Sequence, residues 1–110
     1  MNILISIQEA VQNGNYALRP HAVSHMFAEG FDESNIVESI ENGRILEHYI
    51  EEDRCLIAGT FRISKGNRES LHIVVDYWSE SKVIDWVDIV TAYIPRYPFW
   101  ETSYKRGRKK

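Results

Sequence analysis

The spacing of apolar residues divides the chain into a helical first part and a strand-rich remainder. Apolar residues recur every three or four positions in the first part, which predicts helices over residues 3–12, 20–29 and 33–42. Pro20 suits the first turn of a helix, and Asp32 is a favourable N-cap. Gly30 and Gly43 then mark the ends of the second and third helices.

Beyond Gly43 the pattern changes to an alternation of apolar and polar residues, rich in β-branched and aromatic side chains. It predicts four strands, over residues 44–50, 54–63, 71–78 and 83–95. A short extended piece is also expected just before Pro20, because proline disfavours helical geometry in the preceding residue. The predicted fold is α+β, with the N-terminal helices packed on one face of a four-stranded antiparallel meander. Residues 1–95 are interpreted as a single α+β domain, to which a tail of residues 96–110 belongs.

The composition is typical of a folded globular domain. The 110 residues are 44% hydrophobic and 26% charged, close to the average for such domains. No apolar run approaches the length that spans a bilayer, and the N-terminus has neither the basic leader nor the cleavage site of a secretory signal. We therefore expect a cytoplasmic protein without membrane contact. Cys55 is the single cysteine, so no internal disulfide forms, and its apolar neighbours predict a buried free thiol.

Charge is distributed unevenly along the chain. The net charge is −3, but residues 96–110 carry six basic residues and one acidic residue, a local balance of +5 that leaves −8 for residues 1–95. Aromatic residues are interleaved with these basic ones, which suits single-stranded RNA because cations neutralise phosphates while rings stack on bases. The predicted RNA contacts are Arg96, Lys105, Arg106 and Arg108. The alternative is a solubilising tail. We expect the aromatic residues near Trp100 to pack on the sheet and the last six residues to be exposed.

Several of these segments together resemble a bacterial family known as domain of unknown function 4258. The resemblance begins in "RPHAVSHMFAEGFDESNIVESIENGRILEHY", where a His opens a helix, a Gly-bounded corner leads to a second helix, and a Gly precedes a strand with a Tyr. It continues in "SLHIVVDY" and "DIVTAYIP" and covers roughly residues 16 to 95. Many members have a basic residue near the helix end, where this chain has "HMF". His21 therefore matches the family pattern, and His25 lies where the chain departs from it.

Members of this family are similar to the toxins of type II toxin-antitoxin pairs, with an α+β architecture like that of the RelE, BrnT and MqsR groups. The resemblance implies a RelE-like fold and a metal-independent endoribonuclease that cleaves mRNA, either free or on the ribosome. It also implies a cognate antitoxin, a small partner protein that holds the enzyme inactive, and no cofactor. Because one fold hosts many functions, the activity has to be argued from the site.

Metal-free RNA cleavage needs a base for the ribose 2′-hydroxyl, an acid for the leaving oxygen and positive charge beside the phosphate. The resemblance makes His21 the leading catalytic candidate, and its place at the start of a helix favours a nearby phosphate. His72 lies in a predicted central strand, where it is either a hydrogen-bonded structural residue or part of a cleft. Tyr93 is predicted to share a strand face with Ile89 and Thr91, and the two hydroxyls on that face can orient a phosphate. The alternative for Tyr93 is a packed ring with its hydroxyl on the rim.

A metal site is the other chemistry that the histidines suggest. His21 and His25 are four residues apart and share one helix face, the spacing of paired zinc ligands. The residues between them include no Glu, no third ligand is marked by its spacing, and no cysteine pair exists for a zinc ribbon. We therefore predict no metal, and His25 is interpreted as an ordinary residue of the helix face.

Three functional hypotheses follow from these patterns. The first is an RNA-cleaving toxin, in which His21 is the base or acid, Arg96 or Arg106 contacts phosphate, and Tyr93 orients the substrate. The second is a non-catalytic binding module, or a degenerate family member, whose acidic body docks a small basic partner protein. The third is a structural homodimer formed by pairing of edge strands. The acidic body weighs against extensive RNA contact and confines that contact to the basic end.

Overall fold

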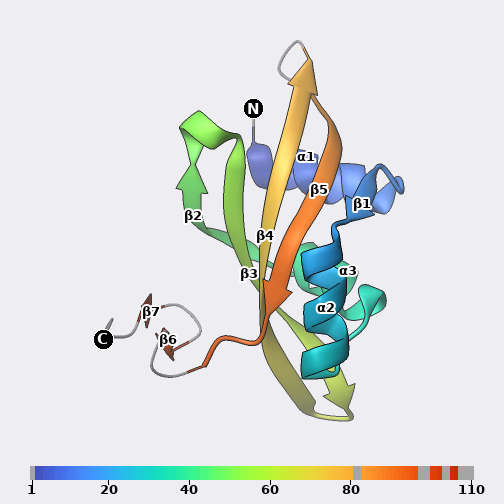
Figure 1. Ribbon diagram of the computed structural model, residues 1–110, viewed down its shortest axis with the longest axis vertical. Coiled ribbons are helices and arrows are strands. Elements are labelled where there is room, and N and C mark those ends of the chain that lie inside the picture. The colour runs from blue at the N-terminus through green and yellow to red at the C-terminus, as the bar shows by residue number, and fades with distance from the viewer. Residues whose placement is uncertain (1, 81–82, 97–99, 103–104, 107–110) are drawn as a thin grey trace.

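The computed structural model describes residues 2–80, 83–96, 100–102 and 105–106, and beyond residue 96 it describes one side chain, that of Trp100. The helices are α1 (Ile3–Gln12), α2 (Pro20–Glu29) and α3 (Glu33–Glu41), with the short strand β1 (Tyr16–Leu18) between the first two. The strands β2 (Arg44–Tyr49), β3 (Arg54–Ser64), β4 (Asn67–Glu80) and β5 (Val83–Tyr93) follow (Figure 1). A short 3-10 helix η1 (Ile50–Glu52) joins β2 to β3, and β6 (Trp100–Thr102) pairs with β7 (Lys105–Arg106) after β5. The three predicted helices are confirmed to within one residue.

The ends of α2 and α3 use the predicted residues. Pro20 occupies the first turn of α2, and Gly30 ends that helix in the left-handed conformation, at φ 81°. Asp32 caps α3 through a reciprocal pair of hydrogen bonds with Asn35. The Asp32 carboxylate accepts from the Asn35 backbone N–H, and the Asn35 side-chain oxygen accepts from the Asp32 backbone N–H, both at 2.9 Å. Hydrogen bonds from Ser34 and Asn35 lower the pKa of the Asp32 carboxyl. None of the helices in the described ranges is long and apolar enough to cross a membrane.

The strands form one five-stranded mixed sheet in the order β1-β5-β4-β3-β2. Strands β2 to β5 make the predicted antiparallel meander. The prediction of four strands is nevertheless wrong, because the extended piece before Pro20 is a fifth strand. It pairs in parallel with β5, from Tyr16 opposite Val87 to Leu18 opposite Ile89. A three-residue strand is too short to show its partner in a hydrophobic pattern, so the pairing depends on where α1 and α2 place it.

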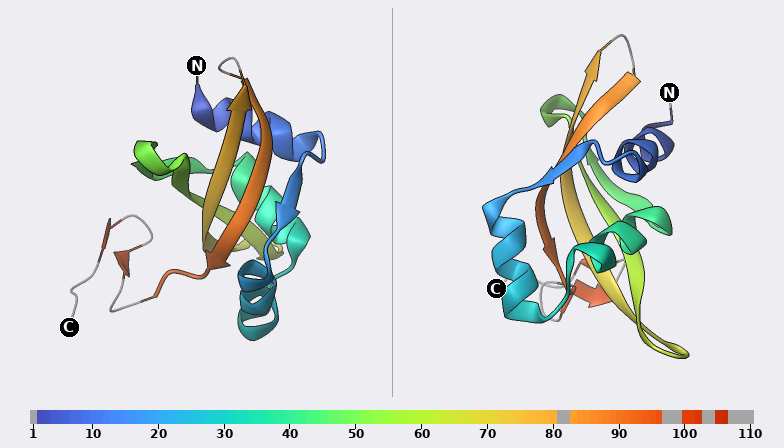
Figure 2. Two further views of the ribbon diagram at one scale, coloured as in Figure 1. Left: turned by 45° about the horizontal axis from the view of Figure 1, so that its top comes forward. Right: turned by 90° about the vertical axis from the view of Figure 1, so that its right-hand side faces the viewer.

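Two of the helices cover one face of the sheet. Helix α1 lies against β5, and α3 lies against β3 and β4. Helix α2 instead runs alongside β5, and in the right-hand view of Figure 2 the strands lie between α2 on one side and α1 and α3 on the other. The expectation that the helices pack on one face is therefore wrong for α2. We call the face of the sheet opposite α1 and α3 the open face.

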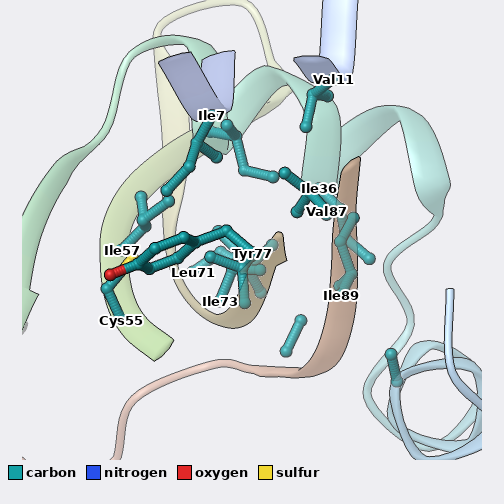
Figure 3. Close-up of a cluster of buried hydrophobic side chains, with 14 of the residues drawn as sticks. Ile7, Val11, Ile36, Cys55, Ile57, Leu71, Ile73, Tyr77, Val87 and Ile89 are labelled. Carbon is teal, nitrogen blue, oxygen red and sulfur yellow. The ribbon is translucent and has the colours of Figure 1, made fainter. Parts of the chain in front are cut away.

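The hydrophobic core lies between the sheet and the helices α1 and α3 (Figure 3). Its fully buried members are Ile7, Ala22, Ile36, Ile40, Cys55, Ile57, Leu71, Ile73, Val75, Val87, Ile89 and Ala92. Cys55 is a buried free thiol, as predicted, and burial raises its pKa to about 12. Gly59 allows α3 to approach the sheet closely, because a Cβ atom at this position would lie 1.9 Å from the Ser39 carbonyl oxygen.

A β-bulge in β5 changes which side chains share a face. Thr91 pairs with Val74, whereas Ile89 pairs with Val75, so β5 accommodates one extra residue between the two pairs. Ile89 consequently faces the core, and Thr91 and Tyr93 lie on the open face. The prediction that these three side chains share one face is wrong, because strict alternation along a strand takes no account of a bulge.

Polar side chains form hydrogen bonds with backbone groups of β3 and of the segment that follows β5. Just before β2 begins, the Asn42 amide pairs with β3 as a strand would, since its Nδ2 donates to the Thr60 carbonyl at 2.8 Å and its Oδ1 accepts from the Thr60 N–H at 2.9 Å. Beside β5, the Glu29 carboxylate of α2 accepts from the Ile94 N–H at 2.9 Å. These contacts leave fewer exposed backbone groups for another strand to pair with.

Candidate functional site

Strand pairing arranges the side chains of the open face in rows that cross the sheet. The first row contains Arg44, Ala58, His72 and Tyr93, from β2 to β5. The second contains Glu47, Leu56, Val74 and Thr91, and the third contains Tyr49, Arg54, Asp76 and Asp88. Neighbouring strands are about 4.8 Å apart, so neighbours in a row lie within contact distance. Two of the predicted catalytic residues, His72 and Tyr93, are therefore side by side.

His72 and Tyr93 form a polar pair beneath an aromatic ring. The Nδ1 atom of His72 lies 3.3 Å from the Tyr93 hydroxyl, and the two ring centroids are 5.3 Å apart. The Trp100 indole packs edge-on against the His72 ring, with centroids 4.3 Å apart and planes at 89°. Both rings are secluded, since His72 is 0% and Trp100 4% exposed. Figure 1 shows the chain turning, after β5, toward the side of the sheet on which β2 lies. The expected packing on the sheet is thus confirmed for Trp100.

Thr91 adds a second polar group close to this pair. It precedes Tyr93 by two residues on β5, and its partner Val74 follows His72 by two residues on β4. Its Oγ1 atom is buried and has no hydrogen-bond partner among the described residues. Buried hydroxyls normally have a partner, so this position has an unused capacity to donate and accept a hydrogen bond.

A shallow hollow borders the same row on the β3 side. It has a volume of ≈ 420 Å³ and is lined by Asn42, Arg44, Ala58, Gly59, Thr60 and Arg68. Ala58 lies between Arg44 and His72 in the row, and its small side chain leaves room there. The guanidinium of Arg68 donates to Glu38 at 2.8 Å, which holds it at the rim. Guanidinium groups suit phosphate recognition, so the hollow places that chemistry next to His72.

The third row is an ion-pair network that joins three parts of the chain. Arg19 donates from Nε to Asp88 at 2.9 Å, and its Nη2 lies 3.3 Å from Asp76. Arg54 donates to Asp76 from Nε at 2.5 Å and from Nη2 at 3.0 Å. The hydrogen bond that Arg54 donates to Asp76 raises the pKa of Arg54. Two carboxylates balance two guanidinium groups, so this row fixes the β1–α2 connection to the sheet and offers little net positive charge to a phosphate.

His21 belongs to α2, whereas the other two catalytic candidates belong to β4 and β5. It is exposed in the first turn of α2, and its ring contacts His25, with centroids 4.8 Å apart. His25 is anchored more firmly, because its Nδ1 lies 2.5 Å from the Glu29 carboxylate. No hydrogen bond or ring contact between described residues joins His21 to His72 or Tyr93. Within the described ranges no group of three or more His, Cys, Asp or Glu side chains is placed to hold a metal ion.

All four predicted RNA contacts lie in the tail, residues 96–110. Arg96 is exposed, and its carbonyl accepts a hydrogen bond from the Trp100 N–H at 3.0 Å. Lys105 and Arg106 form β7, but their side chains lie outside the described part of the structure, as does the whole of Arg108. The RNA contacts of these residues stay predictions.

Two features of the site were missed from the sequence. The Trp100–His72 contact joins residues 28 positions apart. The place of Arg44 in the His72 row depends on the pairing of β2 with β3 and β3 with β4. The alternation of residues along β2 shows which side chains of that strand share a face. Whether the face that carries Arg44 is also the face of His72 depends on the register of the neighbouring strands.

Comparison with known proteins agrees with the resemblance noted in the sequence. A model of the domain of unknown function DUF4258 matches residues 18–94, a span that runs from the end of β1 to the end of β5. Neither the curated proteins nor the solved structures gave a match. The family match includes His21, His72 and Tyr93 and ends before Trp100. Because it covers well over half of the sequence, this chain belongs to the DUF4258 family.

Proposed function

We propose that this protein is the toxin of a type II toxin-antitoxin pair, with a RelE-like architecture, and that it cleaves mRNA without a metal ion at His72 and Tyr93. The single observation that carries the proposal is the hydrogen-bonded contact between these two side chains, 3.3 Å apart, on the face of the sheet away from α1 and α3. Arg44 and Arg68 line the neighbouring hollow, and their guanidinium groups suit the phosphate of RNA, with Arg68 also paired to Glu38.

The pair can handle both protons of the reaction. His72 takes the proton of a ribose 2′-hydroxyl, whose oxygen attacks the adjacent phosphorus and forms a 2′,3′-cyclic phosphate. Tyr93 gives its proton to the 5′-oxygen as the bond from that oxygen to phosphorus breaks. The hydrogen bond between the two residues then returns the proton from His72 to Tyr93. This exchange requires no metal ion, and at its end both residues have returned to their initial protonation states.

Access to His72 sets a condition on this mechanism. The imidazole is 0% exposed, and Trp100 packs against it. RNA therefore reaches His72 only when the Trp100 side chain leaves. Catalytic contacts are often completed only in the substrate complex, so the buried imidazole is compatible with the proposal.

The test is RNA cleavage by the purified protein in the presence of a chelator, on free mRNA and on mRNA bound to ribosomes. Tyr93→Phe removes only the hydroxyl and is expected to lower the rate about 100-fold, the usual contribution of a positioned acid. Tyr16→Phe is the matched control, because the Tyr16 hydroxyl donates a hydrogen bond to Glu33 in another part of the molecule. This variant is expected to retain full activity. His21→Ala, tested in parallel, separates the role that the family resemblance implies from the role proposed for His72. Intact RNA under both conditions would contradict the proposed nuclease activity.

A non-catalytic binding module is the second candidate, and a groove on the helical side supports it. The groove has a volume of ≈ 510 Å³ and is lined by Tyr16, Glu33, Ser34, Val37, Glu38 and Glu41. Its three carboxylates suit a basic partner segment. This function predicts a stable complex with a small basic protein, no RNA cleavage and no arrest of growth on expression. Glu33→Gln combined with Glu41→Gln is expected to weaken that complex.

A further inference from the structure

The Trp100 side chain occupies a site for a flat, two-ring aromatic group on the open face. Its indole is 4% exposed and stands at 89° to the His72 ring, with centroids 4.3 Å apart. His72 is in turn 0% exposed, so water does not reach the imidazole while the indole is in place. A purine base is also a flat two-ring group, close to indole in size. We infer that this place is a purine subsite, which Trp100 fills when RNA is absent.

The polar groups around the site fit a purine better than they fit indole. Indole has a single N–H and no hydrogen-bond acceptor in its ring plane. Correspondingly, the buried Thr91 hydroxyl next to the His72–Tyr93 pair has no partner among the described residues. A purine carries ring nitrogens and an exocyclic amine or carbonyl, which can both accept from and donate to a hydroxyl. Thr91 lies one row from Tyr93, so a purine in the subsite brings such atoms toward a hydroxyl that has no partner among the described residues.

The hollow on the β3 side provides room for the rest of a nucleotide. Arg44, Ala58 and His72 occupy successive strands of one row, so the Cα atoms of Arg44 and His72 are separated by two strand spacings, about 10 Å. Ala58, which stands between them, lines the ≈ 420 Å³ hollow, so the hollow begins one strand away from His72. A base in the subsite thus directs its ribose and phosphate toward Arg44, in agreement with the preference of guanidinium groups for phosphate.

The inference deepens the proposed function and rests on it for the origin of the ligand, a purine of RNA. It adds a competition that the nuclease proposal does not contain, since Trp100 and the base cannot occupy the subsite together. The chain would then inhibit itself, with RNA binding and Trp100 release as two sides of one equilibrium. A purine is favoured over a pyrimidine, because its two rings restore more of the contact area that is lost when the indole leaves.

The test compares two tryptophan variants that differ in their contact with His72. Trp100→Ala empties the subsite, and Trp86→Ala is the matched control, because Trp86 is 40% exposed and makes no ring contact with His72 among the described residues. AMP, GMP and UMP are titrated into each variant while the NMR signals of His72 and Thr91 are followed. Trp100→Ala is expected to bind AMP or GMP at least about tenfold more tightly than Trp86→Ala does and more tightly than it binds UMP, and free indole should compete. Equal purine affinity in the two variants, or equal affinity of Trp100→Ala for UMP, overturns the inference.

A second measurement covers the case in which Trp100→Ala does not fold. The unaltered protein is labelled with 5-fluorotryptophan, and its fluorine signals are assigned by replacing each tryptophan with Phe. Saturation with a purine-rich oligoribonucleotide is expected to shift the Trp100 signal to that of a solvent-exposed ring. An unchanged Trp100 signal, with RNA bound as judged by fluorescence anisotropy, overturns the inference. Purine binding without RNA cleavage would support the purine subsite and contradict the proposed nuclease function. RNA cleavage without purine binding by Trp100→Ala would support the nuclease function and contradict the purine subsite.

Discussion

Asp76 accepts two hydrogen bonds from one guanidinium, from Nε of Arg54 at 2.5 Å and from Nη2 of Arg54 at 3.0 Å. This bidentate geometry joins β3 to β4 on the open face. Arg19, which lies just before α2, adds a contact to the same carboxylate at 3.3 Å. One half-buried carboxylate therefore links two neighbouring strands to the connection between β1 and α2.

Asp76→Asn is expected to lower the free energy of unfolding by about 1 to 2 kcal/mol. The change leaves two partly buried guanidinium groups with one fewer negative charge, although the exposed part of each arginine is screened by solvent. Asp85→Asn on the exposed side of β5 makes the same chemical change and serves as the control, with an expected effect within about 0.5 kcal/mol. Urea denaturation of both variants measures the difference. Equal stabilities would show that the network contributes nothing to folding.

Glu29→Ala is expected to loosen the end of β5. The Glu29 carboxylate accepts the Ile94 N–H at 2.9 Å and also contacts His25, so its removal leaves a strand-edge amide without its acceptor. Loss of one such hydrogen bond costs about 1 kcal/mol. Hydrogen exchange at the Ile94 amide is expected to become faster, while Glu41→Ala, at an exposed position of α3, leaves it unchanged. Unaltered exchange in Glu29→Ala would contradict the role assigned to this carboxylate.

Gly59→Ala is expected to be the most damaging single methyl addition to the sheet. The new Cβ atom would lie 1.9 Å from the Ser39 carbonyl oxygen and 2.6 Å from its carbonyl carbon, and these atoms belong to the α3 backbone. Helix and strand must separate to make room, at a cost of about 3 kcal/mol or more. Gly66→Ala is the comparison, because its Cβ meets no atom within 4 Å but its φ of +80° strains an alanine by about 1 kcal/mol. Thermal unfolding of the two variants is expected to place Gly59→Ala well below Gly66→Ala.

Stability is expected to fall in alkaline solution through the Cys55 thiol. Burial raises the folded-state pKa to about 12, whereas the thiol of the unfolded chain ionises near pH 9. Below pH 9 both states hold the proton and the thiol has no effect. Between pH 9 and pH 12 only the unfolded state loses it, so unfolding becomes easier by as much as about 1.4 kcal/mol for each pH unit. Cys55→Ala is expected to show a shallower slope in urea denaturation under reducing conditions from pH 8 to pH 11. Parallel slopes would mean that Tyr16 and Tyr77, whose pKa values are also raised, account for the whole dependence.

The local signals in the sequence were sufficient for the helices and for four of the strands. Pro20, Gly30 and Asp32 act within a few residues of their own position, so their effects on helix ends are readable without any tertiary structure. The same holds for the family, because the order of short motifs along the chain is itself the signal that the family match confirms.

The candidate site depended on contacts that no local pattern contains. The sequence pointed to His72 and Tyr93 separately, but their contact required the register of β4 on β5 and the bulge that places Thr91 beside them. It also presented His21 as the leading residue, whereas the structure shows its ring against His25 and leaves it without a contact to the His72–Tyr93 pair among the described residues.

The sequence by itself determined the helix boundaries, the antiparallel meander, the buried thiol and the family, because each follows from residues close together or from their order along the chain. Only the tertiary structure decided that β1 joins the sheet in parallel, that α2 flanks β5, and that Trp100 covers His72. These features come from side chains and strands far apart in the sequence, whose pairing is selected by how well they pack together and not by the preference of any single segment.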